Sequence, residues 1–228
     1  MPEFLHFLWI SALGLGLFAM AEWLYHVKKI HVEITRKIVH MGSGLLVLLF
    51  PIFFSIQWYV LLICGSFQLI LVLSMNYGYL KSINAVKRKT YGSIVYPMVV
   101  YLVYLAWYYS GSRQHGAIQS YVYFYLPILI MAFCDPIAAL AGRHYPLLKF
   151  KSLNKSLGGT LAFWALAFLL SCAFLLYSQL FSSKDITWVA IFIATVASLT
   201  ELFSRKGLDN LFIPIVVLIS MYLIEHFF

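Results

Sequence analysis

Apolar runs of about 20 residues, long enough to cross the roughly 30 Å hydrocarbon core of a bilayer as helices, follow one another along the whole chain. This feature constrains the fold more than any other. Hydrophobic residues make up 63% of the chain and charged residues only 11%, less than half of the charged share of an average soluble domain. The composition excludes a soluble enzyme, a disordered chain and a disulfide scaffold. It predicts an all-α fold, a polytopic bundle of transmembrane helices.

We predict about eight spans, with ends uncertain by a few residues. They cover residues 4–25, 38–54, 58–77, 93–109, 121–141, 157–180, 186–202 and 211–228. The connections between the spans are short, so we expect residues 1–228 to form a single integral membrane domain. The short chain is typical of a protein of the bacterial inner membrane.

Lysine and arginine are distributed unevenly among the connections. All 16 of these residues except Arg113 and Lys184 fall in the first, third, fifth and seventh connections. Connections rich in Lys and Arg usually stay in the cytoplasm, so we expect these four to be cytoplasmic and both termini to lie outside. The net charge of +8 then reflects orientation and attraction to anionic membrane lipids, and we expect no nucleic-acid partner.

Three of the 8 acidic residues stand out because they lie next to apolar segments on the predicted cytoplasmic side. Asp135 interrupts the fifth span, Glu201 lies at the inner end of the seventh, and Asp209 opens the eighth. A charge at the centre of a membrane helix costs roughly 2.5–3.5 kcal/mol on insertion scales. These carboxylates either pair with the basic connections and fix the topology, or together bind Mg²⁺, which prefers carboxylate oxygens and leaves places for substrate phosphates.

The segment that begins at Asp135 and ends at Thr160 favours the metal and phosphate interpretation. Small residues and a basic connection follow Asp135, and a Lys-Ser-x-Gly-Gly turn then opens the sixth span. Glycines allow close backbone approach to a ligand, a helix N-terminus favours phosphate, and basic side chains supply the counter-charge. The candidate nucleotide-binding residues in this segment are Gly142, Arg143, Lys155, Ser156, Gly158 and Gly159.

Four sequence blocks on the predicted cytoplasmic side occur in an order typical of one family. They are Arg36-Lys37-Ile-Val-His40-Met-Gly-Ser-Gly44, Arg88-Lys89-Thr-Tyr-Gly92, the segment from Asp135 to Thr160, and Glu201…Asp209-Asn210…Pro214. With these blocks the chain resembles the polyprenol kinase family, membrane kinases for phytol, dolichol and diacylglycerol that use CTP. The family is related to CDP-diacylglycerol synthases.

The resemblance implies that the γ-phosphoryl group of CTP is transferred to the hydroxyl of a lipid alcohol at the cytoplasmic face. The alcohol is either an isoprenoid of the phytol or polyprenol type or diacylglycerol. The implied Mg²⁺ ligands are Asp135 and Asp209, with Glu201 as a third ligand or as the base toward the hydroxyl. Asn210 is implied as a ligand or a nucleotide contact. Arg36 and Lys37 are implied to stabilise the transferring charge, supported by His40.

Two other functions remain open. A cytidylyltransferase would attach CMP to a lipid phosphate, but the Lys-Asp pair expected of CDP-diacylglycerol synthases after the central block is missing. A small transporter would carry ionisable residues near the middle of its spans, whereas the acidic residues here gather at one face. His40 could instead hydrogen-bond within the bundle, Arg36 and Lys37 could serve orientation alone, and a homodimer is left open.

Overall fold

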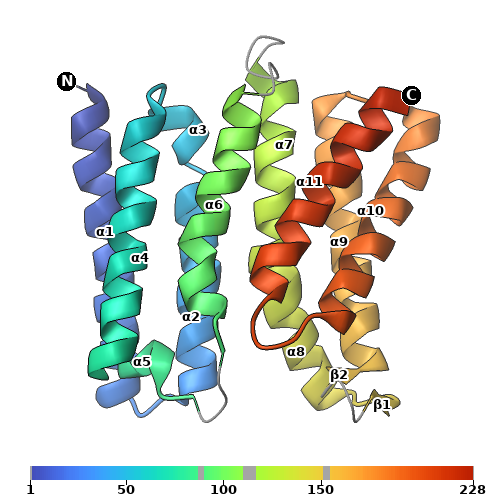
Figure 1. The fold of residues 1–228 in the computed structure, drawn as a ribbon. Coiled ribbons are helices and arrows are strands. Elements are labelled where there is room, and N and C mark those ends of the chain that lie inside the picture. The colour runs from blue at the N-terminus through green and yellow to red at the C-terminus, as the bar shows by residue number, and fades with distance from the viewer. Residues whose placement is uncertain (1, 87–89, 110–116, 151–154, 228) are drawn as a thin grey trace. The chain divides into compact units, whose positions relative to one another are not determined.

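The computed structural model describes residues 2–86, 90–109, 117–150 and 155–227. Most of these residues are helical, and two short strands form the sheet in this part of the chain. The chain divides into two compact units, Met1–Tyr104 and Leu105–Phe228. Figure 1 shows the first unit in blue to green and the second in green to red.

The first unit is built around its N-terminal helices. Its described elements are α1 (Pro2–His26), α2 (Val32–Val47), α3 (Phe50–Phe53), α4 (Gln57–Tyr77), α5 (Lys81–Asn84) and the first part of α6 (Gly92–Tyr109). A buried cluster joins α1, α2, α4 and α5, and it consists of Phe18, Ala21, Val39, Leu71 and Ile83. The short helix α5 is therefore part of the packed structure and not a loose connection.

The second unit contains the remaining helices and a small hairpin. Its described elements are α7 (Ala117–Leu129), the π-helical segment η2 (Ile130–Cys134), α8 (Asp135–His144), β1 (Lys149–Phe150), β2 (Lys155–Ser156), α9 (Leu157–Ser178), α10 (Ser183–Phe203) and α11 (Asp209–Phe227). Helix α9 packs against α8 and α10. Small residues such as Ala190, Ala194 and Ala197 are fully buried on α10, which lets neighbouring helices approach closely in a membrane.

In the described chain, 8 helical segments are long and apolar enough to cross a membrane, which confirms the predicted number of spans. They are Pro2–His26, Val32–Phe53, Gln57–Tyr77, Gly92–Tyr109, Tyr121–His144, Leu157–Ser178, Ser183–Phe203 and Asp209–His226. Large apolar side chains such as Trp9 and Trp188 remain 69% and 73% exposed, as expected for surfaces that contact lipid. The predicted all-α transmembrane bundle is confirmed.

The second span differs most from its prediction, because α2 begins at Val32 and not at residue 38. The first turns of α2 contain Glu33, Arg36 and Lys37. These charges lower the local hydropathy, so the apolar pattern alone places the start of the helix too late.

Within each unit, connections rich in basic residues lie at the same end. Helix α5 contacts Glu22 near the end of α1 and Thr35 near the start of α2. In the second unit, Lys155 of the hairpin contacts Glu201 at the end of α10. This agrees with the prediction that connections rich in Lys and Arg alternate along the chain with connections poor in them. The cytoplasmic location of that end, the outer location of the termini and the single domain stay predictions.

Candidate functional site

In the second unit, Asp135 directly follows an irregular stretch of helix. Segment η2 interrupts the regular helix between α7 and α8, immediately before Asp135 and Pro136. Proline has no N–H group, and its ring clashes in a regular helix with the carbonyl four residues earlier. The wider π turn accommodates this ring, and such segments are frequent at functional sites. Asp135 is half-buried at this position.

Close polar contacts join the end of α8 to the start of α9. Ser156 is the N-cap of α9, and its Oγ accepts a 3.2 Å hydrogen bond from the backbone N–H of Gly159. The same hydroxyl donates to the carbonyl of Gly142 at 3.5 Å. A Cβ atom at Gly142 would lie only 2.7 Å from that hydroxyl. Gly142 and Ser156 thus hold α8 against α9, while Arg143 lies exposed in the last turn of α8. Their roles in nucleotide binding stay predictions.

Gly158 and Gly159 lie where the backbone of the chain itself comes very close. A Cβ atom at Gly158 would lie 2.1 Å from the carbonyl oxygen of Tyr145, and one at Gly159 would lie 2.9 Å from that of Ala138. The sequence predicts that these glycines allow a ligand to approach. In the structure they allow α8 and the turn after it to approach α9. Contact between phosphate and the N–H groups of this helix start stays a prediction.

Lys155 and Glu201 form an ion pair that joins strand β2 to α10. The Nζ atom of Lys155 lies 2.6 Å from Oε1 of Glu201 and also donates to the backbone carbonyl of Glu201. The exposed fractions of the two side chains are only 18% and 8%. An unpaired carboxylate buried to this degree is costly, so the pair explains how Glu201 is tolerated there.

Two further carboxylates lie within electrostatic range of this pair. Gly207 adopts a φ of 83°, which glycine tolerates without strain, and the chain turns there between α10 and α11. Asp209 follows as the first residue of α11, and its Oδ1 accepts a 3.1 Å hydrogen bond from the backbone N–H of Asn210. The charges of Asp135 and Asp209 both act on Glu201. The structure therefore brings together residues from two separate sequence blocks, namely Asp135, Lys155, Glu201, Asp209 and Asn210.

The donor set is compatible with Mg²⁺ that is bound together with a nucleotide. Among the residues that the structure describes, no three His, Cys, Asp or Glu side chains are arranged to hold a metal ion. Mg²⁺ usually takes one or two carboxylates and fills its other places with water and substrate phosphates. Asp135 and Asp209, both half-buried, can supply these carboxylates. Glu201 is already engaged by Lys155, and its role as a third ligand stays a prediction.

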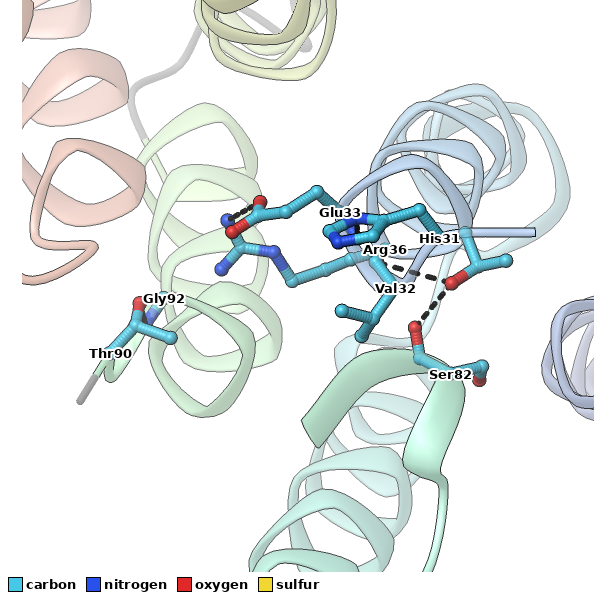
Figure 2. Close-up of polar contacts among 8 residues, drawn as sticks. His31, Val32, Glu33, Arg36, Ser82, Thr90 and Gly92 are labelled. Atoms are coloured by element: carbon cyan, nitrogen blue, oxygen red, sulfur yellow. Dashed lines mark hydrogen bonds and ion pairs between the residues drawn. The ribbon is translucent and has the colours of Figure 1, made fainter. Parts of the chain in front are cut away.

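In the first unit, Arg36 pairs with a glutamate on its own helix. Figure 2 shows the side chains of Arg36 and Glu33 in contact, with Nη2 of Arg36 3.3 Å from Oε2 of Glu33. His31 precedes α2 as its N-cap, and its Nδ1 accepts a 3.2 Å hydrogen bond from the backbone N–H of Glu33. Both side chains of the ion pair are mostly buried, at 21% and 16% exposure. The predicted action of Arg36 on a phosphate remains a prediction.

Thr35, next to Arg36, ties α2 to α5. Its Oγ1 donates a 2.6 Å hydrogen bond to the carbonyl of Ser82, which Figure 2 shows beside α2. The N–H of Ser82 in turn donates to Oε1 of Glu22 on α1 at 2.8 Å. Thr35 is fully buried. The sequence does not reveal this junction, because its residues are 47 and 60 positions apart and match no motif.

The other predicted residues of the first unit lie further along α2. Lys37 and His40 are both half-buried, and the ring of His40 lies edge-on to that of Tyr96 on α6 with centroids 4.9 Å apart. Arg88 and Lys89 fall outside the residues that the structure describes. At the end of that block, the N–H of Gly92 donates to Oγ1 of Thr90 at 3.4 Å (Figure 2).

The predicted site residues therefore fall into two groups. Arg36, Lys37 and His40 belong to the first unit, and the remaining residues belong to the second. A single site that combines both groups stays a prediction.

One curated protein is similar to most of this chain. The chain is 34% identical over 198 residues to a phytol kinase from Synechocystis sp., and the aligned region covers 86% of this chain and 81% of that relative. No family model matches the chain, and no solved structure does. Identity at this level over most of both chains is sufficient to establish a family.

Proposed function

The chain belongs to the polyprenol kinase family, and from this premise we propose that it is a lipid-alcohol kinase with CTP as its phosphoryl donor. The acceptor is an isoprenoid alcohol of the phytol or polyprenol type, with diacylglycerol as the second acceptor class. The reaction takes place at the cytoplasmic end of the spans. The similarity to a phytol kinase carries the proposal, and the gathering of charged residues in the second unit supports it.

The proposed reaction forms one bond and breaks one. The hydroxyl oxygen of the lipid attacks the γ-phosphorus of CTP, and the bond from that phosphorus to the β–γ bridging oxygen breaks. CDP leaves with the electron pair of this bond, the hydroxyl proton is released, and a lipid monophosphate remains. Such transfers depend on positioning and on charge neutralisation more than on covalent chemistry of the protein.

We assign the binding of Mg²⁺ to Asp135 and Asp209, the half-buried carboxylates near Glu201. Mg²⁺ held there with the nucleotide would supply positive charge that neutralises negative charge on the phosphates. The chain itself contributes two oxygen donors from different helices, α8 and α11. This arrangement leaves the other coordination places for phosphates and water.

The phosphates are held by basic groups at the start of α9. Lys155 lies immediately before the N-cap Ser156, where the helix dipole also favours negative charge. Arg143 in the last turn of α8 is exposed, so its side chain can reorient toward a phosphate. Arg36 and Lys37 stabilise the transferring charge, with His40 as their support. The lipid hydroxyl arrives laterally from the inner leaflet, with its chain between spans.

The proposal is tested with purified protein in detergent or nanodiscs, supplied with Mg²⁺, CTP and one lipid alcohol at a time. We expect a lipid monophosphate from at least one isoprenoid alcohol or from diacylglycerol. Asp135→Asn should lower turnover at least about 100-fold, in line with electrostatic stabilisation lost from a transition state, whereas Lys184→Met at the other end of α10 should keep it. A folded protein that phosphorylates no lipid alcohol would contradict the proposal.

A further inference from the structure

Lys155 is fixed by Glu201 through two contacts made by one ammonium group. Its Nζ lies 2.6 Å from Oε1 of Glu201 and also donates to the backbone carbonyl of the same residue. A lysine side chain normally has considerable rotamer freedom. Two simultaneous acceptors on one buried residue remove most of it, so the position of Nζ is determined by α10.

Lys155 lies next to the start of a helix, where an anion is favoured. Lys155 precedes Ser156, and Ser156 caps α9, so the backbone of Lys155 leads directly into a helix N-terminus, while α10 holds its Nζ. An ammonium group has three donors. Two of them go to Glu201, and a third is sufficient for one phosphate oxygen.

The same geometry makes Glu201 a poor metal ligand. Its Oε1 is occupied by Lys155, and in the described chain it forms no metal-binding group of three with other His, Cys, Asp or Glu side chains. To bind Mg²⁺ through Oε1, Glu201 would have to give up its ion pair with Lys155.

We propose that Glu201 is a positioning residue, which holds the ammonium group of Lys155 against the nucleotide phosphates, and that it is not a ligand of Mg²⁺. This inference rests on the proposed kinase function. It assigns the metal to Asp135 and Asp209 and the phosphate contact to Lys155. The role of Glu201 is to hold Lys155 in place.

The test is a double-mutant cycle on lipid phosphorylation with Lys155→Met, Glu201→Gln and the double variant. For each protein, kcat and KM for CTP are measured, together with the Mg²⁺ concentration for half-maximal activity. We expect each single variant to lower kcat/KM for CTP about 10- to 100-fold, the loss of one charge-assisted hydrogen bond. The double variant should be no worse than Lys155→Met, because both changes remove the same contact. The half-activating Mg²⁺ concentration should stay within about twofold of wild type in Glu201→Gln, since a ligand loss would change it by 10-fold or more.

Two controls separate positioning from other effects. Lys184→Met removes a positive charge at the opposite end of α10 and should leave kcat/KM unchanged. The thermal midpoint of each variant is measured in parallel, because the loss of one partner of a buried ion pair is destabilising, whereas neutralising both partners is often tolerated. If neither single variant folds, the double variant alone decides, since its KM for CTP must rise while its Mg²⁺ requirement stays the same.

Two results would overturn the inference while leaving the kinase function intact. A rise of 10-fold or more in the Mg²⁺ concentration needed by Glu201→Gln would show that Glu201 takes part in Mg²⁺ binding, contrary to the inference. Recovery of wild-type kcat/KM in the double variant would show that the pair only stabilises the fold. Failure of the kinase function itself is distinguishable, because the wild-type protein would then produce no lipid phosphate.

Discussion

Replacing Gly158 by alanine should destabilise the protein, because the space for a side chain is already filled by backbone. The added Cβ would lie 2.1 Å from the carbonyl oxygen of Tyr145, whereas real Cβ atoms essentially never come within 3.0 Å of another heavy atom. Helix α9 or the turn at Tyr145 must therefore move by at least about 1 Å, and overpacking of this kind costs about 1–3 kcal/mol. The better helix propensity of alanine offsets at most about 1 kcal/mol of this cost.

We expect a net loss of about 1–2 kcal/mol, which corresponds to a decrease of roughly 2–8 °C in the thermal midpoint of a chain of this length. A thiol-reactive fluorescent dye can follow unfolding in detergent, because Cys64 and Cys134 are buried and free in the folded protein. Both thiols become accessible to the dye as the helices separate.

The chain offers a matched control for this substitution. Gly65 on α4 has no heavy atom within 4 Å of the position that a Cβ would occupy. Gly65→Ala should therefore leave the thermal midpoint unchanged or raise it, by at most about 1 kcal/mol in stability. A wild-type melting temperature for Gly158→Ala, or an equal loss of stability in Gly65→Ala, would contradict this prediction.

Three further predictions concern the caps, the junction in the first unit and the orientation. Thr35→Val should lower stability by about 1–2 kcal/mol, because it removes the hydrogen bond to Ser82 inside the protein; an unchanged thermal midpoint would contradict this. Ser156→Ala should cost about 1 kcal/mol through loss of the N-cap of α9, as measured by the same thermal assay. In intact cells, a membrane-impermeant maleimide should label Lys184→Cys, whereas Arg205→Cys should react only after permeabilisation. The opposite labelling pattern would reverse the predicted orientation.

The number of spans could be predicted from the sequence because span length and hydropathy are local properties of the chain. Hydropathy alone nevertheless places the start of α2 six residues too late. Hydropathy treats Glu33 and Arg36 as polar, although they neutralise each other in an ion pair and are accommodated in the first turns of the helix. Local composition cannot show that two charges are paired.

The residues of the candidate site could be selected from the sequence, but their contacts could not. The ion pair between Lys155 and Glu201 joins residues 46 positions apart, and only the packing of α9 on α10 brings them together. The glycines of the central block are a second example. A glycine indicates close approach by something, and the sequence could not show that Gly158 faces the carbonyl of Tyr145.

Above all, we propose that this protein transfers the terminal phosphoryl group of CTP to a lipid alcohol. Purified protein with Mg²⁺ is given a mixture of lipid alcohols and lipid phosphates, and CTP labelled at either the α- or the γ-phosphate. We expect label to enter the lipid phase from γ-labelled CTP alone, and the labelled product then identifies the alcohol. Label that enters the lipid phase from α-labelled CTP alone would contradict this proposal and identify a cytidylyltransferase.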